Sequence, residues 1–172
     1  GAVVYERGME IAENKKHRLV LLCAAWLAAF LFLLPSRQTG LSATFLDVGQ
    51  GDGIVLRSES HTILVDCGSS QQKSIGEKVL VPYLKSQGVT RLDLAVMTGD
   101  QDHMNGIRYL LEHPESGIRV GGLMMPEAGK DEIYGKMAEL AKKRDIPVFY
   151  AQKGDIWNNF PGKGMSMECL SP

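Results

Sequence analysis

The sequence has almost no excess of charge of either sign. Its 19 lysines and arginines are balanced by 20 aspartates and glutamates, for a formal net charge of -1 at pH 7. This balance excludes a generally basic surface of the kind that attracts nucleic acid, and it leaves no acidic tail. A protein of this composition that binds phosphate chains must do so through a local patch or through another component of its assembly.

Cysteine is scarce, and internal repeats and low-complexity segments are absent. The three cysteines are Cys23, Cys67 and Cys169. Cys23 lies in an apolar run and cannot easily meet the others; Cys67 and Cys169 could pair, or all three could be buried thiols. With 44% hydrophobic and 23% charged residues, the 172-residue chain has the composition of one moderately sized globular domain.

One uncharged run departs from this soluble pattern. Residues 19–34 read LVLLCAAWLAAFLFLL, follow the basic residues Lys15, Lys16 and Arg18, and are followed by Pro35. As a helix the run would span roughly 24 Å, slightly less than the ~30 Å hydrocarbon core of a bilayer. The pattern favours a transmembrane helix whose flanking cations reach the headgroups.

Two other interpretations of this run remain open. A secretory signal would have a long, acid-containing leading region and no evident small-residue cleavage site, and a buried soluble helix would need a large surrounding core. For a membrane helix, the positive-inside rule places residues 1–18 in the cytoplasm and everything after Pro35 outside. The predicted organisation is a cytoplasmic segment 1–18, a transmembrane helix 19–34, a linker 35–40 and a globular region 41–172.

The globular region begins with short β runs and continues with alternating helices and strands. Strands are predicted at Ser42–Val48, Ile54–Arg57, Thr62–Val65, Leu92–Met97, Val120–Met125, Pro147–Tyr150 and Met165–Leu170. Helices are predicted from Ile75 to a stop at Gly88, at Met104–His113, and at Asp131–Arg144 with Asp131 as the N-cap. This order predicts an α/β fold with helices on one or both faces of a mixed sheet.

The sharpest chemical pattern is the segment Thr98-Gly99-Asp100-Gln101-Asp102-His103. It directly follows a strand that is apolar throughout and directly precedes a helix. Two carboxylates and an imidazole on one tight loop can converge on Zn²⁺ or Mn²⁺, and α/β proteins commonly place sites at such strand ends. The alternative is that the acids cap the helix that follows.

Two further segments carry acids beside glycines or a strand end. In Asp47-Val48-Gly49-Gln50-Gly51-Asp52-Gly53 the glycines allow a tight turn from which Asp47 and Asp52 project, although an ordinary solvated turn has the same composition. In the other segment Asp66 ends the apolar run Ile63–Val65. It could orient a metal ligand, or it could simply begin a turn.

Taken together, the series FLDVGQGD, TILVDCG, VLVPYLKSQGVTRLDLAVMT and DQDHMNG resembles the metallo-β-lactamase-like domain of ComEC-type DNA-uptake membrane proteins. The resemblance covers roughly residues 18–172 and rests on the joint order and spacing of the motifs. It implies an αββα-type fold with a mixed sheet, preceded by one transmembrane helix. It also implies that residues 41–172 are the N-terminal portion of the domain and therefore incomplete.

The resemblance also implies a metal loop of the form His-x-Asp/His-x-Asp-His. Asp100, Asp102 and His103 match its last three functional positions, whereas Thr98 stands where the first His normally stands. The implied metal ligands are therefore Asp100, Asp102 and His103, with Thr98, Asp66, Asp52, Asp47 and Gln50 lining the site. Because the first His is replaced and the family's later ligands are not in the chain, we expect at most one divalent ion, Zn²⁺ or Mn²⁺.

The function implied by this resemblance has three versions. The domain could be a metal-dependent nuclease acting on incoming DNA, or a non-catalytic module that supports or gates the DNA channel; a secreted metallo-hydrolase is the third. The implied partners are DNA, expected to be single-stranded, the membrane and other uptake proteins. No catalytic residue can be named.

Other candidate residues carry weaker signals. His61 and His113 are expected to be solvated, because a ligand histidine needs positioned partners. The basic cluster Lys142, Lys143 and Arg144 suits a helix end better than a DNA patch. Trp157 and Phe160 are expected to pack in a loop that contains glycine and proline, and stacking on a nucleic-acid base is the alternative role.

Overall fold

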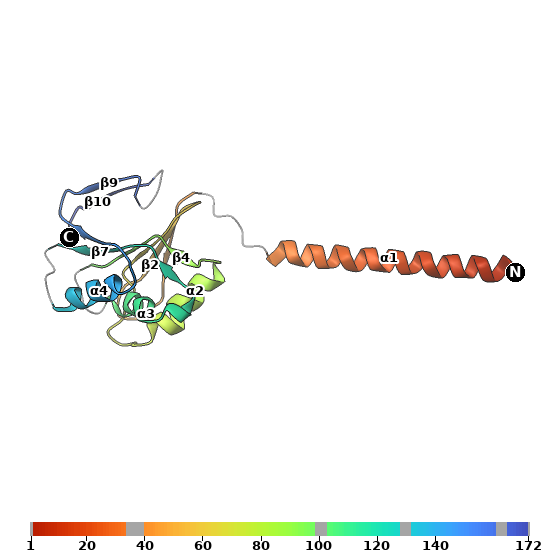
Figure 1. The fold of residues 1–172 in the computed structure, drawn as a ribbon, viewed down its shortest axis with the longest axis horizontal. Coiled ribbons are helices and arrows are strands. Elements are labelled where there is room, and N and C mark those ends of the chain that lie inside the picture. Colours follow the sequence, from red (N-terminus) through yellow and green to blue (C-terminus); the bar gives the residue numbers. More distant parts are fainter. Residues whose placement is uncertain (1, 34–39, 99–102, 128–131, 161–164, 172) are drawn as a thin grey trace. The chain divides into compact units, whose positions relative to one another are not determined.

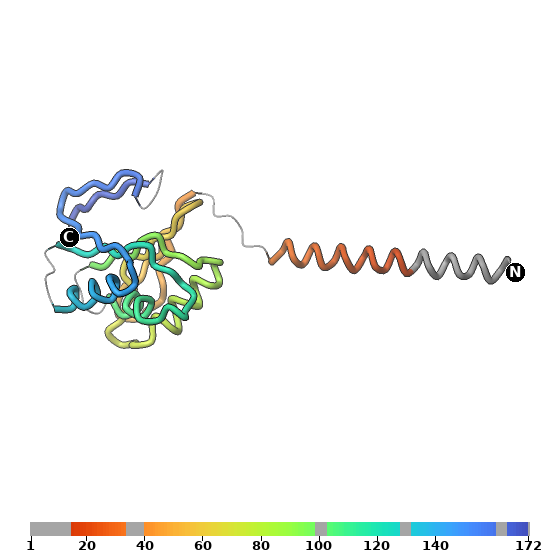
Figure 2. The backbone as a smooth tube through the Cα atoms, in the orientation of Figure 1, coloured from red at the N-terminus to blue at the C-terminus, as the bar shows by residue number. Residues whose placement is uncertain are grey.

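The computed structural model describes residues 2–33, 40–98, 103–127, 132–160 and 165–171. The chain divides into two compact units, Gly1–Ser36 and Arg37–Pro172. The backbone of both units is traced in Figure 2.

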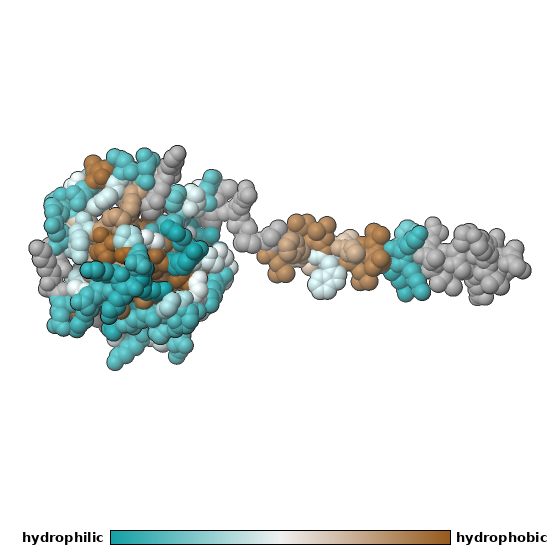
Figure 3. Space-filling view, viewed as in Figure 1, coloured by the Kyte–Doolittle hydropathy of each residue, from teal (hydrophilic) through white to brown (hydrophobic). Residues whose placement is uncertain are grey.

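The first unit is one helix, α1, at Ala2–Leu33. Its stretch Lys15–Leu33 has a mean hydropathy of 1.7 and is long and apolar enough to cross a membrane. Each side chain in this stretch is exposed, including that of Cys23, so the interpretation of Cys23 as a buried thiol is wrong for this unit. Figure 3 shows the apolar stretch as a brown band beside the hydrophilic residues that precede it. This stretch is therefore a candidate membrane span by its length and composition.

The second unit is built on a six-stranded mixed sheet. Its order is β1-β2-β3-β5-β7-β8, with β1 to β3 paired antiparallel and β3, β5, β7 and β8 paired parallel. The strands are β1 Ser42–Phe45, β2 Ile54–Arg57, β3 Thr62–Val65, β5 Leu94–Val96, β7 Leu123–Pro126 and β8 Val148–Ala151. The prediction of an α/β fold with a mixed sheet is confirmed, and β2 and β3 have the predicted bounds.

Two predicted strands are wrong as continuous elements, because each is broken near its start. Residues 92–97 divide at Asp93, whose carboxylate accepts a hydrogen bond from the Thr62 amide at 2.9 Å. Residues 120–125 divide at Gly121 and Gly122. The leading pieces, β4 Arg91–Leu92 and β6 Arg119–Val120, pair with each other as a separate parallel ribbon.

The helices gather on one side of the sheet (Figure 1). They are a π-helical turn η1 at Gly76–Leu80 that continues into α2 at Val81–Ser86, α3 at Asn105–Glu112, a short 3-10 turn η3 at Pro114–Ser116, and α4 at Glu132–Lys142. Gly88 has a φ of 68°, the left-handed conformation predicted for a helix stop. Asp131, the predicted N-cap of α4, lies outside the described residues. The helices and the sheet enclose the main core, in which Leu64, Leu84, Ala95, Ile107 and Leu110 are fully buried.

A two-stranded hairpin lies over the other face of the sheet. Strand β9, Ile156–Asn158, pairs antiparallel with β10, Ser166–Glu168. Trp157 and Phe160 pack against a second apolar cluster that includes Ile63, Leu94 and Met124. The expectation that Trp157 lies in a loop is wrong, because the pairing with Met167 holds it in a strand.

Candidate functional site

The candidate site lies where the parallel strands β3 and β5 end side by side. The Asp66 amide, directly after β3, donates to the Val96 carbonyl at 2.8 Å. Asp66 then adopts a φ of 52°, a left-handed conformation that aspartate tolerates better than most residues. This turn directs the Asp66 carboxylate, rather than its carbonyl, at the end of β5.

The Asp66 carboxylate binds Thr98 through both of its oxygens. The Thr98 amide donates to Oδ1 at 2.8 Å, and the Thr98 hydroxyl donates to Oδ2 at 2.6 Å. Because Asp66 is only 5% exposed, these hydrogen bonds to a charged acceptor supply part of the solvation that burial removes. The hydroxyl of Thr98 is therefore committed to Asp66, and the Thr98 carbonyl accepts a hydrogen bond from the Tyr134 hydroxyl at 3.1 Å.

The imidazole of His103 stands between two carboxylates. Its Nδ1 is 3.6 Å from Oδ2 of Asp66, and its Nε2 is 3.6 Å from Oδ2 of Asp52. Nδ1 is buried and has no hydrogen-bond partner among the described residues, whereas the Asp52 side chain is two-thirds exposed. An imidazole with one nitrogen facing a buried carboxylate and the other facing an accessible one fits a metal ligand oriented by its neighbour. The two carboxylates make the surroundings of the ring negative, which would favour a bound cation.

Close backbone contacts at glycines hold together the three loops of the site, which contain Asp52, Cys67 and His103. The Gly68 amide donates to the Asp52 carbonyl at 3.0 Å, and a Cβ on Gly51 would lie 2.1 Å from the Gly68 carbonyl oxygen. The Cys67 amide donates to the His103 carbonyl at 2.8 Å, and a Cβ on Gly106 would lie 2.7 Å from the Cys67 sulfur. Contacts this short leave no room for a side chain, so these two glycines determine how closely the loops approach.

The structure brings together only some of the residues predicted for the site. Asp52, Asp66, Thr98 and His103 converge, as described above. Asp47 and Gln50 are exposed, and Gln50 contributes only its carbonyl, which accepts from the Ser70 amide at 2.9 Å. Asp100 and Asp102 lie outside the described residues. Within the described residues, no group of three or more His, Cys, Asp or Glu side chains could hold a metal ion.

Asn105 is a positioning residue that sequence reasoning missed. Its side-chain amide donates to the carbonyls of Ser69 and Gln72, both at 3.0 Å, and so ties the loop after β3 to the start of α3. The motif DQDHMNG contains this residue, but an asparagine inside a helix-forming stretch carries no sign of a distant partner. Cys67 is not a further ligand candidate, because burial and the nearby Asp66 raise its thiol pKa to about 12, which keeps the thiol protonated at neutral pH.

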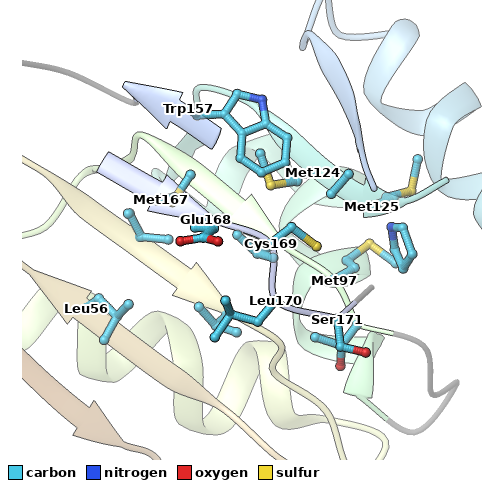
Figure 4. A pocket seen from close by; sticks show the side chains of 16 residues that line it. Leu56, Met97, Met124, Met125, Trp157, Met167, Glu168, Cys169, Leu170 and Ser171 are labelled. Atoms are coloured by element: carbon cyan, nitrogen blue, oxygen red, sulfur yellow. The ribbon is translucent and has the colours of Figure 1, made fainter. Parts of the chain in front are cut away.

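A separate apolar cavity of about 570 Å³ lies between the sheet and the β9–β10 hairpin. It reaches from Leu56 past Met97 and Thr98 to Cys169, and among the described residues of its lining only Glu168 is charged. Figure 4 shows the sulfur-containing side chains of Met97, Met124, Met125, Met167 and Cys169 around it. The lining is suited to apolar contact and offers little for ionic chemistry.

The motifs and this geometry can be compared with known proteins. No family model matches the chain. ComE operon protein 3 of Bacillus subtilis is 28% identical over 161 residues, which are 83% of this chain and 20% of that protein. Competence protein ComA of Neisseria gonorrhoeae is 29% identical over 126 residues, or 73% of this chain and 16% of that protein.

A third relative is named for recombination and not for competence. Recombination protein 2 of Haemophilus influenzae is 35% identical over 95 residues, or 55% of this chain and 12% of that protein. The chain is a homologue of the ComEC-type competence proteins. The resemblance to ComEC-type proteins that the motifs indicated is therefore confirmed. The ComEC homologue spans a fifth or less of the length of these relatives.

Proposed function

We propose that residues 41–172 belong to a metallo-β-lactamase-like domain of the αββα type, working in a DNA-uptake protein of the cell membrane. The proposal is supported by the kinship with competence proteins and by a mixed sheet with helices on one face. The observation that carries it is the meeting of Asp66, Thr98 and His103 at the carboxyl ends of two parallel strands, where α/β folds bind ligands. Its partners are incoming single-stranded DNA and the other uptake proteins.

The globular unit is proposed to lie outside the cytoplasm. Lys15, Lys16 and Arg18 precede the apolar stretch of α1, and such clusters stay on the cytoplasmic side. A phosphatase reporter fused after Gly40 should therefore be active, and a reporter that works only in the cytosol should be silent. The reverse pattern would contradict this orientation, and release of a cleaved fusion into the medium would indicate a secreted protein instead.

The proposed chemistry is hydrolysis of a phosphodiester bond in one DNA strand. His103 would be a ligand of one Zn²⁺ or Mn²⁺ ion, with Asp100 and Asp102 of the same loop as further ligands. A divalent ion bound there would supply a water of lowered pKa and polarise a phosphoryl oxygen. Asp66 would hold the His103 ring in place, and the two hydrogen bonds from Thr98 would keep Asp66 itself in place.

A non-catalytic role in supporting or gating the channel is the second candidate, and one observation favours it. The residue at the first ligand position is Thr98, and its hydroxyl is used in the 2.6 Å hydrogen bond to Asp66. A loop without this ligand offers the metal fewer ligands than the family's loop does. It could keep its structural role after its chemistry has been lost.

Replacing His103 by alanine in the host organism separates these two candidates. Under the proposed nuclease role, His103→Ala should reduce transformation and stop the release of nucleotides from the strand that does not enter. Radiolabelled duplex DNA measures both quantities at once, and Gln50→Ala, at an exposed residue of the same loop cluster, is the control. Undiminished nucleotide release would refute the nuclease role. Undiminished transformation after deletion of residues 41–172 would refute the role in uptake.

A further inference from the structure

A polar pocket lies at the end of β3 and β5 that is opposite to the candidate site. Its volume is about 260 Å³, and the β2–β3 turn and the segment after α2 form its walls. Thr62 begins β3 at this pocket and Asp66 follows its other end, which separates the two regions by roughly 13 Å along the strand. Val89 is the one large apolar residue in the lining and is 6% exposed.

Arg57 brings an uncompensated charge to this pocket. Its Nε is buried and has no hydrogen-bond partner in the part of the chain that the structure describes, and its Nη1 donates to the neutral Oε1 of Gln87 at 3.3 Å. A buried N–H of a charged group that is left without an acceptor is costly. The planar guanidinium suits a ligand with two oxygens, such as a phosphate or a carboxylate.

Arg91 and Arg119 add a second concentration of positive charge. They are register partners in the parallel β4–β6 ribbon, so their side chains leave the same face of the ribbon. The Arg91 guanidinium lies over Gly121, because a Cβ added to Gly121 would be 2.8 Å from Nη2 of Arg91. This is the face of the ribbon from which the Arg119 side chain also projects. Like charges placed opposite each other in a sheet repel, and a bound anion would relieve this repulsion.

Few carboxylates offset these arginines. Asp93 lies 3.4 Å from Nε of Arg91, but its other oxygen accepts from the Thr62 amide, and Glu59 lies exposed in the β2–β3 turn. The Arg119 amide donates to the Thr90 carbonyl at 2.9 Å, but the Arg119 guanidinium makes no hydrogen bond or ion pair within the described part of the chain. With three arginines and two carboxylates, the region carries a small excess of positive charge in a chain with a net charge of -1.

We propose that Arg57, Arg91 and Arg119, the arginine cluster, bind consecutive phosphates of a DNA strand. The identity of the polyanion as DNA rests on the proposed function, whereas the phosphodiester chemistry rests on the cluster itself. Arginine forks beside serine and threonine hydroxyls are typical phosphate contacts. A membrane-surface contact would instead require exposed apolar residues beside the cations, and the pocket lining provides none.

The test is binding of fluorescein-labelled (dT)20 to the full chain in a neutral detergent, measured by anisotropy between 50 and 200 mM salt. Arg91→Gln with Arg119→Gln should weaken binding by roughly tenfold per arginine at 50 mM salt and lower the salt slope by about 1.4. Arg57→Lys keeps the charge but loses the fork and should weaken binding less than Arg57→Gln. The charge-matched control is Lys142→Gln with Lys143→Gln, at two exposed residues where α4 ends, which should leave affinity and slope unchanged.

Each other outcome overturns the proposal in a distinct way. If wild type binds (dT)20 and the arginine double variant binds equally well, the cluster is not the contact, while the role in uptake stands. If the double variant still binds (dT)20 and loses binding only to the anionic lipid dihexanoylphosphatidylglycerol, the cluster faces lipid. If wild type binds no DNA, the inference fails, and the transformation experiment above still decides the proposed function. Thermal melts of every variant without ligand check that all of them fold.

Discussion

Replacing Gly51 by alanine is expected to destabilise the globular unit by about 3 kcal/mol or more. The added Cβ would lie 2.1 Å from the Gly68 carbonyl oxygen and 2.9 Å from the Ser69 Cα. Both are backbone atoms, so no side-chain rotation can relieve the overlap. The loop must move, which would break the hydrogen bond from the Gly68 amide to the Asp52 carbonyl and displace Asp52 from His103.

Gly135→Ala is the matched control for this prediction, with an expected effect of opposite sign. Gly135 lies inside α4, and a Cβ there meets no atom within 4 Å. Alanine at this position should stabilise the unit by about 0.5–1 kcal/mol, because it improves helix propensity without a steric cost. Urea unfolding followed by Trp157 fluorescence in a Trp26→Phe background measures both variants. Equal stability of Gly51→Ala and wild type would show that the two loops do not approach this closely.

Replacing Thr98 by histidine is expected to increase affinity for Zn²⁺ or Mn²⁺ by at least about tenfold while reducing stability without metal. The imidazole would supply the first ligand of the family loop, and Thr98 is exposed, so a larger side chain has room. The same change removes the hydroxyl that donates to Asp66 at 2.6 Å. Loss of a hydrogen bond to a buried charge costs about 1.5–3 kcal/mol. Affinity and stability should therefore change in opposite directions.

Thr98→Val separates these two effects, because it removes the hydroxyl without adding a ligand. It should show the loss of stability and no gain in metal affinity, whereas His103→Ala should abolish metal binding in either background. Calorimetric titration gives the affinities, and urea unfolding in a chelator gives the stabilities. If Thr98→His leaves affinity unchanged, Thr98 does not occupy the ligand position. If Thr98→Val is as stable as wild type, the hydrogen bond to Asp66 does not support the loop.

Much of the fold could be predicted from local patterns. The β2 and β3 runs, the helical spacing that ends at Gly88 and the apolar stretch before Pro35 are each encoded in adjacent residues, so the patterns predicted them well. Errors arose where a distant partner decides the outcome. Asp93 interrupts an apolar strand because it binds Thr62, which lies 31 residues away, and Trp157 is in a strand because of its pairing with Met167.

The sequence by itself determined the relationship to competence proteins, the candidate membrane helix and the presence of acids and a histidine at strand ends. These features depend on residue order, spacing and local periodicity, which can be read without coordinates. Only the tertiary structure decided that Thr98 donates to Asp66, that Asp52 faces His103, and that Arg91 and Arg119 are register partners. Each of these pairs is separated by 28 to 51 positions in the sequence. They meet because the parallel pairing of β3 with β5 and of β4 with β6 aligns the strand ends, and that pairing depends on burial of the whole core.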